Sequence, residues 1–234
     1  SLKAMAEGLR NQLDKSDKSE SKAPEKRYLD LWKPCFPAQQ VLPLAKASIR
    51  EDAALQRVAA YIKDRGLVFP DRVLYAFHTA LKVNAISPLL VLAGISGTGK
   101  SALPRRYAEG MGMHFLLLAV QPRWDSPQDL FGFFNFLEGR YKATELSRAL
   151  VQFERWNSDD WPADYPNSLK DRVLLVLLDE MNLARVEYYF SEFLSRLETR
   201  RGVRREDSAD RANAEIALEA GSLDQTDKQI RLFP

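Results

Sequence analysis

The feature that most constrains the fold of this chain is a glycine-rich octapeptide, Gly94 to Ser101, near the middle of its 234 residues. It fits the pattern G-x-x-x-x-G-K-[ST] at every fixed position. Glycines in such a loop let successive backbone N–H groups turn toward phosphate oxygens, and the N-terminus of the following helix adds partial positive charge. The loop lies between an apolar run of strand length, 88–94, and a helical pattern, 99–110. The sequence therefore predicts a phosphate-binding loop between a strand and a helix.

Each residue type in this loop has its own role in binding a nucleoside triphosphate. The Lys100 ammonium is expected to neutralise the β- and γ-phosphates, and the Ser101 hydroxyl is expected to ligate Mg²⁺. The predicted nucleotide-binding residues are Gly94, Ile95, Ser96, Gly97, Thr98, Gly99, Lys100, Ser101 and Ala102. The alternative for the same residues is a glycine-rich turn that only caps a helix.

A second motif follows 70 or more residues later, where the aliphatic run 174–178 leads into Asp179 and Glu180. Such a run predicts a buried strand that delivers Asp179 to the carboxyl edge of a sheet, where open α/β sheets bind their ligands. Asp179 is predicted to hold Mg²⁺ directly or through water. Glu180 is predicted to orient and polarise an attacking water molecule. The alternative is an acidic pair that merely ends a strand.

Three apolar runs without polar alternation indicate strands that are buried on both faces, at 88–94, 114–120 and 171–180. Helical patterns alternate with them at 99–110, 144–156 and 183–197. We therefore expect an α/β fold of three layers, in which a parallel sheet lies between helices.

The rest of the chain divides into segments of different composition. Residues 1–13 are expected to end an upstream helix, and the serine-rich, charged stretch 14–27 is expected to be a flexible linker. Residues 28–66 are predicted to form a packed entry segment and a helix, which Ser48 and Glu51 open as a capping box. A further helix is expected from 70 to 83, and the nucleotide-binding core from 67 to 234.

Composition excludes several classes of protein. A net charge of +2 gives no overall electrostatic case for binding nucleic acid or a membrane. One cysteine, Cys35, cannot form an internal disulfide, and among its aromatic neighbours it is predicted to fill a core. No Cys/His cluster suggests zinc. The longest apolar runs have about ten residues, against roughly 20 for a membrane span, and the expected location is the cytoplasm.

Two other nucleotide-binding classes compete with this interpretation. Asp129–Gly132 reads DxxG, as in GTPase switches, but it follows a polar loop instead of a strand, and no [NT]KxD motif occurs. Small-molecule kinases share the phosphate loop, but their second carboxylate is less often a strand-ending Asp-Glu pair. Both classes are therefore disfavoured.

The chain resembles the AAA+ ATPases, and within them the McrB-like group, whose members are motor subunits of modification-dependent restriction systems; MoxR and dynein-related modules are cousins. The resemblance is carried by FHTALK…LLVLAGISGTGKS, VQPRWDSPQDLFGFF and LLVLLDEMNLARVEYYFSEFLSRLE, and it covers 67–234. It implies that 94–101 is the Walker A motif and that Asp179 and Glu180 form Walker B. Lys100 and Glu180 are then the catalytic residues, and Ser101 and Asp179 the residues at the metal.

The resemblance also implies roles outside these two motifs. Helix 71–83 corresponds to the element near the nucleotide base, and Gln121 to a polar residue that restrains the catalytic glutamate. The segment 124–134 is similar to a loop that reaches toward the central channel or a partner. Its aromatic residues either grip a polymer or pack internally: Trp124, Phe131, Phe133 and Phe134.

As a whole, the resemblance implies a homo-oligomeric ring, expected to be a hexamer, that hydrolyses ATP, or GTP, with Mg²⁺ to move a partner. A nuclease subunit and DNA are the expected partners. Binding to a membrane is not expected. The sensor strand, arginine finger and helical lid are expected beyond Pro234, so this chain is expected to be an incomplete, weakly active part of a longer protein. The alternatives are a MoxR-like remodeller of proteins and a nucleotide-binding regulatory module that does not hydrolyse.

Three segments in the second half of the chain lie outside the Walker A and Walker B motifs. A basic concentration is either a solvated surface or a contact to DNA or a neighbouring subunit; it consists of Arg196, Arg200, Arg201, Arg204, Arg205 and Arg211. The segments 214–218 and 229–233 are expected to pair as a hairpin. The stretch 156–171 reads as a surface loop without an assignable role.

Overall fold

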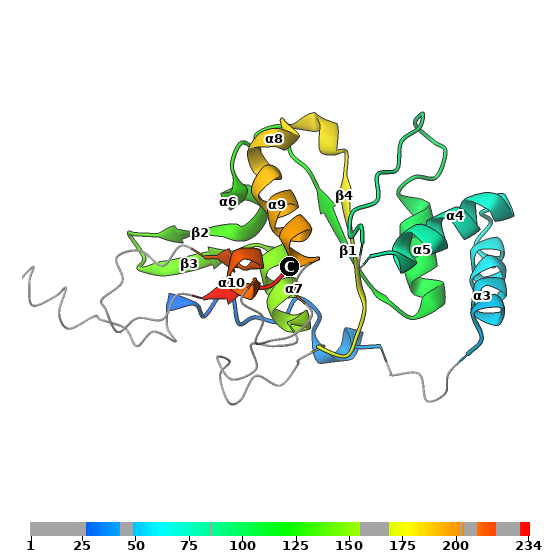
Figure 1. Ribbon diagram of the computed structural model, residues 1–234, viewed down its shortest axis with the longest axis horizontal. Helices are drawn as coiled ribbons and strands as arrows, with labels where there is room; N and C mark the ends of the chain where they lie inside the picture. The colour runs from blue at the N-terminus through cyan, green and yellow to red at the C-terminus, as the bar shows by residue number, and fades with distance from the viewer. Residues whose placement is uncertain are drawn as a thin grey trace, which may run out of the picture.

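The computed structural model describes residues 27–42, 49–84, 86–154, 169–201, 203, 210–218 and 230–234 (Figure 1). The expected helix end at 1–13, all but the last residue of the expected linker at 14–27, and most of the surface loop at 156–171 lie outside these residues.

Two parallel strands form the centre of the fold, β1 (His114–Ala119) and β4 (Leu174–Asp179). They pair in register from His114 opposite Leu174 to Ala119 opposite Asp179. Successive side chains of β4 point to opposite faces, so Leu174, Val176 and Leu178 pack against one core and Leu175 against another. The strand therefore has a core on each face, as predicted, although its six residues are only partly buried.

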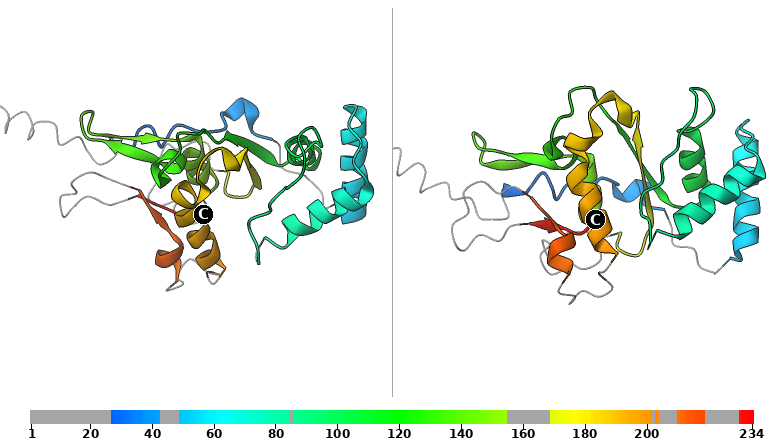
Figure 2. Two further views of the ribbon diagram at one scale, coloured as in Figure 1. Left: turned by 90° about the horizontal axis from the view of Figure 1, so that it is seen from above. Right: turned by 45° about the horizontal axis from the view of Figure 1, so that its top comes forward.

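The larger core covers one face of these strands. Figure 1 shows that its helices lie together on one side of β1 and β4, and the second view in Figure 2 agrees. These helices are α6 (Pro127–Phe131), α7 (Glu145–Phe153), α8 (Val186–Tyr189) and α9 (Ser191–Arg200). Leu116 and Leu118 of β1 meet Tyr189, Phe190 and Phe193 there.

The smaller core covers the other face and contains the helix that follows the glycine-rich loop. It is built by α3 (Glu51–Asp64), α4 (Asp71–Lys82) and α5 (Ala102–Met111). Val58 is fully buried and Phe77 packs edge-on against Tyr107 at 5.1 Å between ring centroids. The chain is thus an α/β protein whose parallel strands have helices on both faces.

The predicted first strand is wrong for the described residues. Residues 87–95 have no regular secondary structure, and the sheet of β1 and β4 has two strands in the part of the chain that the structure describes. Leu89 and Leu92 pack against the larger and the smaller core, but Val91 is 74% exposed. An apolar run predicts burial, whereas a strand also needs a neighbour that completes its hydrogen-bond ladder.

The predicted helix at 183–197 is divided into three pieces. A 3₁₀ turn, η3 (Met181–Leu183), precedes α8, and Phe190 lies at the junction of α8 and α9. The break changes which residues face the core. Tyr189, Phe190, Phe193 and Leu197 are buried, whereas Leu183, Val186 and Leu194 are exposed.

Two antiparallel hairpins complete the sheet structure. The hairpin of β2 (Gly132–Asn135) and β3 (Arg140–Ala143) projects from the body and was not predicted (Figures 1 and 2). The predicted pairing near the C-terminus is confirmed, because β5 (Ile216–Ala217) pairs with β6 (Arg231–Leu232). The short helix α10 (Arg211–Ala214) leads into β5.

The entry segment packs as predicted. Tyr28 and Leu31 are buried in the larger core, and a 3₁₀ turn, η1 (Ala38–Gln40), follows. The predicted capping box is wrong, since the N-cap of α3 is Arg50 and makes no side-chain cap. The Glu51 carboxylate instead bonds His78 and Lys82 of α4.

Candidate phosphate-loop site

The glycine-rich loop leads directly into α5, whose first turn faces it. Gly97 and Gly99 have φ angles of 80° and 85°, a left-handed backbone that glycine adopts without steric cost. Leu103 N donates to Gly99 O at 2.9 Å, so the helix begins at the end of the loop. A loop that ends at a helix N-terminus in this way favours the binding of an anion.

The Lys100 side chain folds back over its own loop. Its Nζ donates to Gly94 O at 2.8 Å and to Ile95 O at 2.7 Å. Thr98 Oγ1 also donates to Ile95 O, at 2.9 Å. The Lys100 ammonium is therefore bound by two backbone carbonyl oxygens of its own loop. A charged phosphate oxygen would compete with these neutral carbonyls for the ammonium, because charge-assisted hydrogen bonds are stronger.

Ser101 and Asp179 meet at the edge of the sheet. Ser101 Oγ donates to Asp179 Oδ1 at 2.9 Å, although the two residues are 78 positions apart. Asp179 is the last residue of β4, and its carbonyl accepts from Val120 N at 3.1 Å. The sequence predicted both residues as metal ligands, and a hydroxyl and a carboxylate oxygen are hard donors of the kind that Mg²⁺ prefers.

Glu180 follows Asp179 and has an unusual backbone. Its φ of 55° and ψ of 43° are left-handed, and among the described residues it is the only non-glycine with positive φ. An L-residue is strained in this region, because its Cβ approaches the following carbonyl oxygen. The side chain is exposed at the carboxyl end of β4, and the strain marks this position as a candidate functional residue.

An aromatic ring closes one side of the loop. A Cβ added to Gly99 would lie 2.8 Å from Cε1 of Phe69, which stands just before α4. Next to the loop, a cavity of about 260 Å³ lies between α5 and β1. Its lining contains apolar and basic side chains: Leu67, Ser101, Ala102, Arg105, Arg106, Phe115 and Leu117.

A hydrogen-bonded chain connects α3, α4 and α5 beside this site. The Tyr107 hydroxyl lies 2.6 Å from His78 Nδ1, and His78 Nε2 lies 2.8 Å from Glu51 Oε1. Burial, with a smaller contribution from Glu51, raises the pKa of Tyr107 to about 12. The arrangement fits Tyr107 as donor to Nδ1 and Nε2–H as donor to Glu51, which ties the loop helix to its two neighbours.

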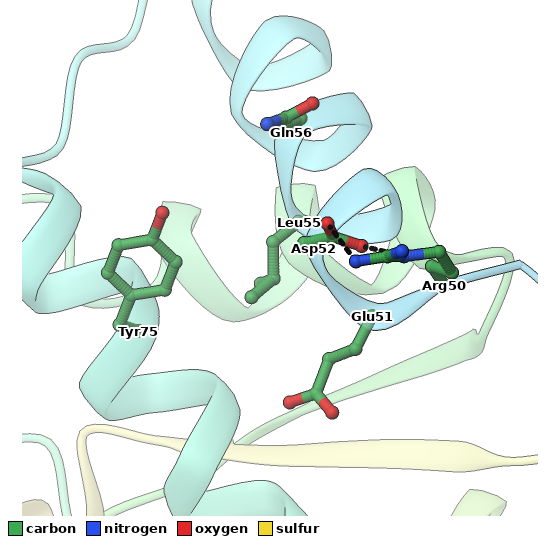
Figure 3. Close-up of a pocket in the computed structure, with 6 residues that line it drawn as sticks. All are labelled: Arg50, Glu51, Asp52, Leu55, Gln56 and Tyr75. Carbon is green, nitrogen blue, oxygen red and sulfur yellow. Dashed lines mark hydrogen bonds and ion pairs between the residues drawn. The ribbon is translucent and has the colours of Figure 1, made fainter.

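A second cavity, of about 470 Å³, lies away from the predicted site residues. Figure 3 shows the paired Arg50 and Asp52 at the start of α3 and Tyr75 across from them on α4. Its other lining residues are Glu51, Leu55 and Gln56. None of the residues that the sequence singles out for phosphate or metal lines it.

The aromatic residues of segment 124–134 mostly pack internally. Phe131 and Phe134 are buried, and Trp124 packs edge-on against Tyr189 at 5.3 Å. Phe133 is 45% exposed. The sequence did not point to Phe136 and Leu137, an exposed apolar pair in the turn of the β2–β3 hairpin.

The structure also places three other residues that the sequence analysis discussed. Gln121 is exposed after β1, and nothing in the described residues joins it to Glu180. Asp129 of the DxxG sequence caps α6, since its carboxylate accepts from Asp125 N and Ser126 N at 2.9 and 3.1 Å. Cys35 is half-buried against the larger core, and this burial raises the pKa of its thiol to about 11, which supports its predicted packing role.

Within the basic concentration, Arg196 and Arg211 make contacts inside the chain, Arg200 is partly buried, and Arg201 is exposed. Arg196 donates to Asn213 O at 2.6 Å, Arg211 pairs with Glu215 at 2.8 Å, and burial lowers the pKa of Arg200. Arg204 and Arg205 lie outside the described residues. These contacts favour a structural role for this region.

Neither a membrane segment nor a clustered metal site accompanies the loop. Within the described ranges, no helix combines the length and the apolar character needed to cross a bilayer. The same residues contain no group of three or more His, Cys, Asp or Glu side chains arranged to hold a metal ion. The predicted Mg²⁺ ligands, Ser101 and Asp179, are one hydroxyl and one carboxylate and so do not form such a group.

Comparisons with protein-family models, curated proteins and solved structures give no match to this chain.

Proposed function

We propose that this chain binds a nucleoside triphosphate with Mg²⁺ at 94–101 and Asp179, and that it belongs to a nucleotide-driven motor of the AAA+ type. The observation that carries the proposal is the 2.9 Å hydrogen bond between Ser101 Oγ and Asp179 Oδ1. Two residues that independent motifs assign to one metal ion lie in contact, at the N-terminus of α5 and the carboxyl end of β4. The left-handed backbone of Gly97 and Gly99 in the exposed loop beside them also supports the proposal.

The residues present fit hydrolysis of the terminal phosphoanhydride bond, in which water adds to the γ-phosphorus and the nucleoside diphosphate leaves. Lys100 would exchange its two carbonyl partners for phosphate oxygens, and Ser101 and Asp179 would hold the metal. Bound Mg²⁺ supplies charge stabilisation at the phosphate oxygens. The Glu180 carboxylate would hold the attacking water and accept its proton.

The wider setting that we propose is a homo-oligomeric ring in the cytoplasm, with ATP, or GTP, as the substrate. The resemblance to the McrB-like group supports DNA restriction or defence with a nuclease partner, and a MoxR-like role on protein clients is the alternative. Within the described residues, the engaged arginines do not by themselves form a surface for DNA.

Nucleotide binding tests the site directly. Fluorescent ATP and GTP analogues are titrated into the chain with and without Mg²⁺, and the variants are Lys100→Ala and Asp179→Asn. We expect Lys100→Ala to weaken binding about 10- to 100-fold, because charge-assisted hydrogen bonds contribute about 1.5–3 kcal/mol. Asp179→Asn should remove the Mg²⁺ dependence. Lys142→Ala, at a surface ion pair with Glu138, is the matched control.

Turnover separates a hydrolase from a regulatory module that only binds. Glu180→Gln should bind nucleotide as the wild type does and lose hydrolysis, measured as single turnover with the chain in excess. Equal rates for wild type and variant would remove Glu180 from the mechanism. Unchanged binding in both Lys100→Ala and Asp179→Asn would contradict the proposed site itself.

A further inference from the structure

We propose that Tyr189 is a positioning residue for Glu180, and that the Trp124 side chain holds Tyr189 in place. The buried Tyr189 hydroxyl fixes the turn that keeps Glu180 in its left-handed conformation. This inference rests on the proposed function, in which Glu180 holds the attacking water. It extends the site to the loop that follows β1.

The backbone at Glu180 requires something to hold it. A left-handed conformation is unfavourable for an L-residue with a long side chain and persists where surrounding contacts fix it. Leu183 N donates to Glu180 O at 2.9 Å and closes the turn of η3. One such bond in an exposed turn competes with water, so a second and protected contact is needed.

Tyr189 supplies that contact. Its hydroxyl donates to Met181 O at 3.1 Å, one residue beyond Glu180, and its side chain is fully buried. Burial raises the pKa of Tyr189, so the hydroxyl stays protonated and remains a donor at neutral pH. Because the ring is packed in the larger core, the bond anchors an exposed turn to a rigid part of the molecule.

Trp124 connects Tyr189 to the loop after β1. The two rings meet edge-on with centroids 5.3 Å apart, and the backbone N–H of Trp124 donates to Gln121 O at 3.0 Å. Val120 N in turn donates to Asp179 O at 3.1 Å. The residues after β1 and those after β4 are therefore joined twice, once through the backbone beside Asp179 and once through Trp124 and Tyr189.

The direction of the Glu180 carboxylate depends on this arrangement. A backbone released from the left-handed region would rotate the Cα–Cβ bond and carry the carboxylate away from its position beside Asp179. Nucleotide binding, which uses 94–101 and Asp179, would be preserved. Loss of the Tyr189 hydroxyl should therefore reduce the rate of hydrolysis without changing affinity.

The first test compares two buried tyrosines. Tyr189→Phe removes the hydroxyl that bonds Met181 O, and Tyr141→Phe removes an equally buried hydroxyl that bonds Phe131 O at 2.9 Å. We expect Tyr189→Phe to lower the single-turnover rate at least tenfold with a nucleotide Kd within twofold of wild type. Tyr141→Phe should lower the unfolding midpoint but leave the rate unchanged. Equal rates for the two variants would overturn the inference.

The second test does not depend on turnover. Glu180→Gly removes the left-handed strain, so it should raise the thermal unfolding midpoint of the wild type and of Tyr141→Phe by a few degrees. In the Tyr189→Phe background, where Glu180 has already relaxed, no increase is expected. An equal increase in all three backgrounds would show that Tyr189 does not hold Glu180. Absence of nucleotide binding would end the proposed function, yet this comparison would still decide the role of Tyr189.

Discussion

At the scale of single residues, Gly99 is the position in the phosphate loop that tolerates a side chain least. Its φ is 85°, and an added Cβ would lie within 3 Å of two atoms of the Phe69 ring. Gly99→Ala therefore combines left-handed strain, of about 1–3 kcal/mol, with displacement of an aromatic ring. We expect a lower free energy of unfolding in urea and weaker nucleotide binding.

The control for this prediction is Gly66→Ala. Gly66 has a φ of 73°, but nothing lies within 4 Å of an added Cβ, so this variant measures the backbone strain alone. The difference between the two variants reports the contact with Phe69. Equal losses of stability would mean that the Phe69 ring moves aside freely.

His114 makes folding sensitive to mild acid. The ring is 3% exposed, packs edge-on between Phe36 and Phe153, and in the described part of the chain its Nδ1 has no hydrogen-bond partner. Burial lowers the pKa of His114, and the charge of Arg172 lowers it further. The folded state therefore prefers the neutral ring, whereas the unfolded chain takes up a proton below about pH 6.5.

The sign of the effect follows from this difference in proton uptake. The stability associated with His114 is fully present above the unfolded pKa and is lost as the pH falls toward the lowered folded pKa. Urea unfolding at pH 7.5, 6.5 and 5.5 should show this loss, and His114→Phe should reduce it. An unchanged pH dependence in His114→Phe would contradict the assignment of this loss to His114.

At the scale of elements, the DxxG sequence is explained by a helix cap. Ser126 and Asp129 form a capping box at the start of α6, which orients the segment between β1 and the β2–β3 hairpin. Asp129→Ala should cost about 1 kcal/mol in urea unfolding, as the loss of a cap does, and leave nucleotide affinity unchanged. The neighbouring exposed carboxylate in Asp125→Ala is the control. A selective loss of GTP binding in Asp129→Ala would revive the GTPase-switch interpretation.

The elements that the sequence predicted well are those whose signals are local. The aliphatic run of β4 and the glycine pattern before α5 each specify one element from adjacent residues, and the structure confirms both elements. The β2–β3 hairpin has strands of four residues, too short for a period to emerge. The run at 88–94 shows the opposite error. It is apolar and was predicted as a strand, but in the described residues no neighbouring strand pairs with it.

The sequence predicted the polar residues of the candidate site, but it did not predict the contacts that hold them in position. Ser101 and Asp179 were expected together, since the ends of parallel strands meet one edge of the sheet, and they lie in contact. The left-handed Glu180 and its link to Tyr189 were missed. The helical period was assumed to continue through Phe190, where the chain bends, and this moved Tyr189 out of the predicted core face.

At the scale of the whole molecule, the site depends on two cores that share one pair of strands. The phosphate loop helix α5 belongs to the smaller core, whereas Tyr189 belongs to the larger one. Leu175 and Val176 are neighbours in β4 and pack against different cores. Damage to one core should therefore be transmitted through β1 and β4 to the other, and the molecule should unfold in one cooperative transition.

Val58→Ala tests this coupling. Val58 is fully buried in the smaller core, so its truncation should cost about 2 kcal/mol. Among the described residues, the tryptophans Trp32 and Trp124 pack against the larger core and none packs in the smaller one. We expect far-UV circular dichroism and tryptophan fluorescence to show the same decrease in unfolding midpoint. The contradicting result is a dichroism midpoint that falls while the fluorescence midpoint stays at the wild-type value. It would mean that α3, α4 and α5 unfold separately from the larger core. In that case nucleotide bound by the loop could not influence Glu180 through the sheet.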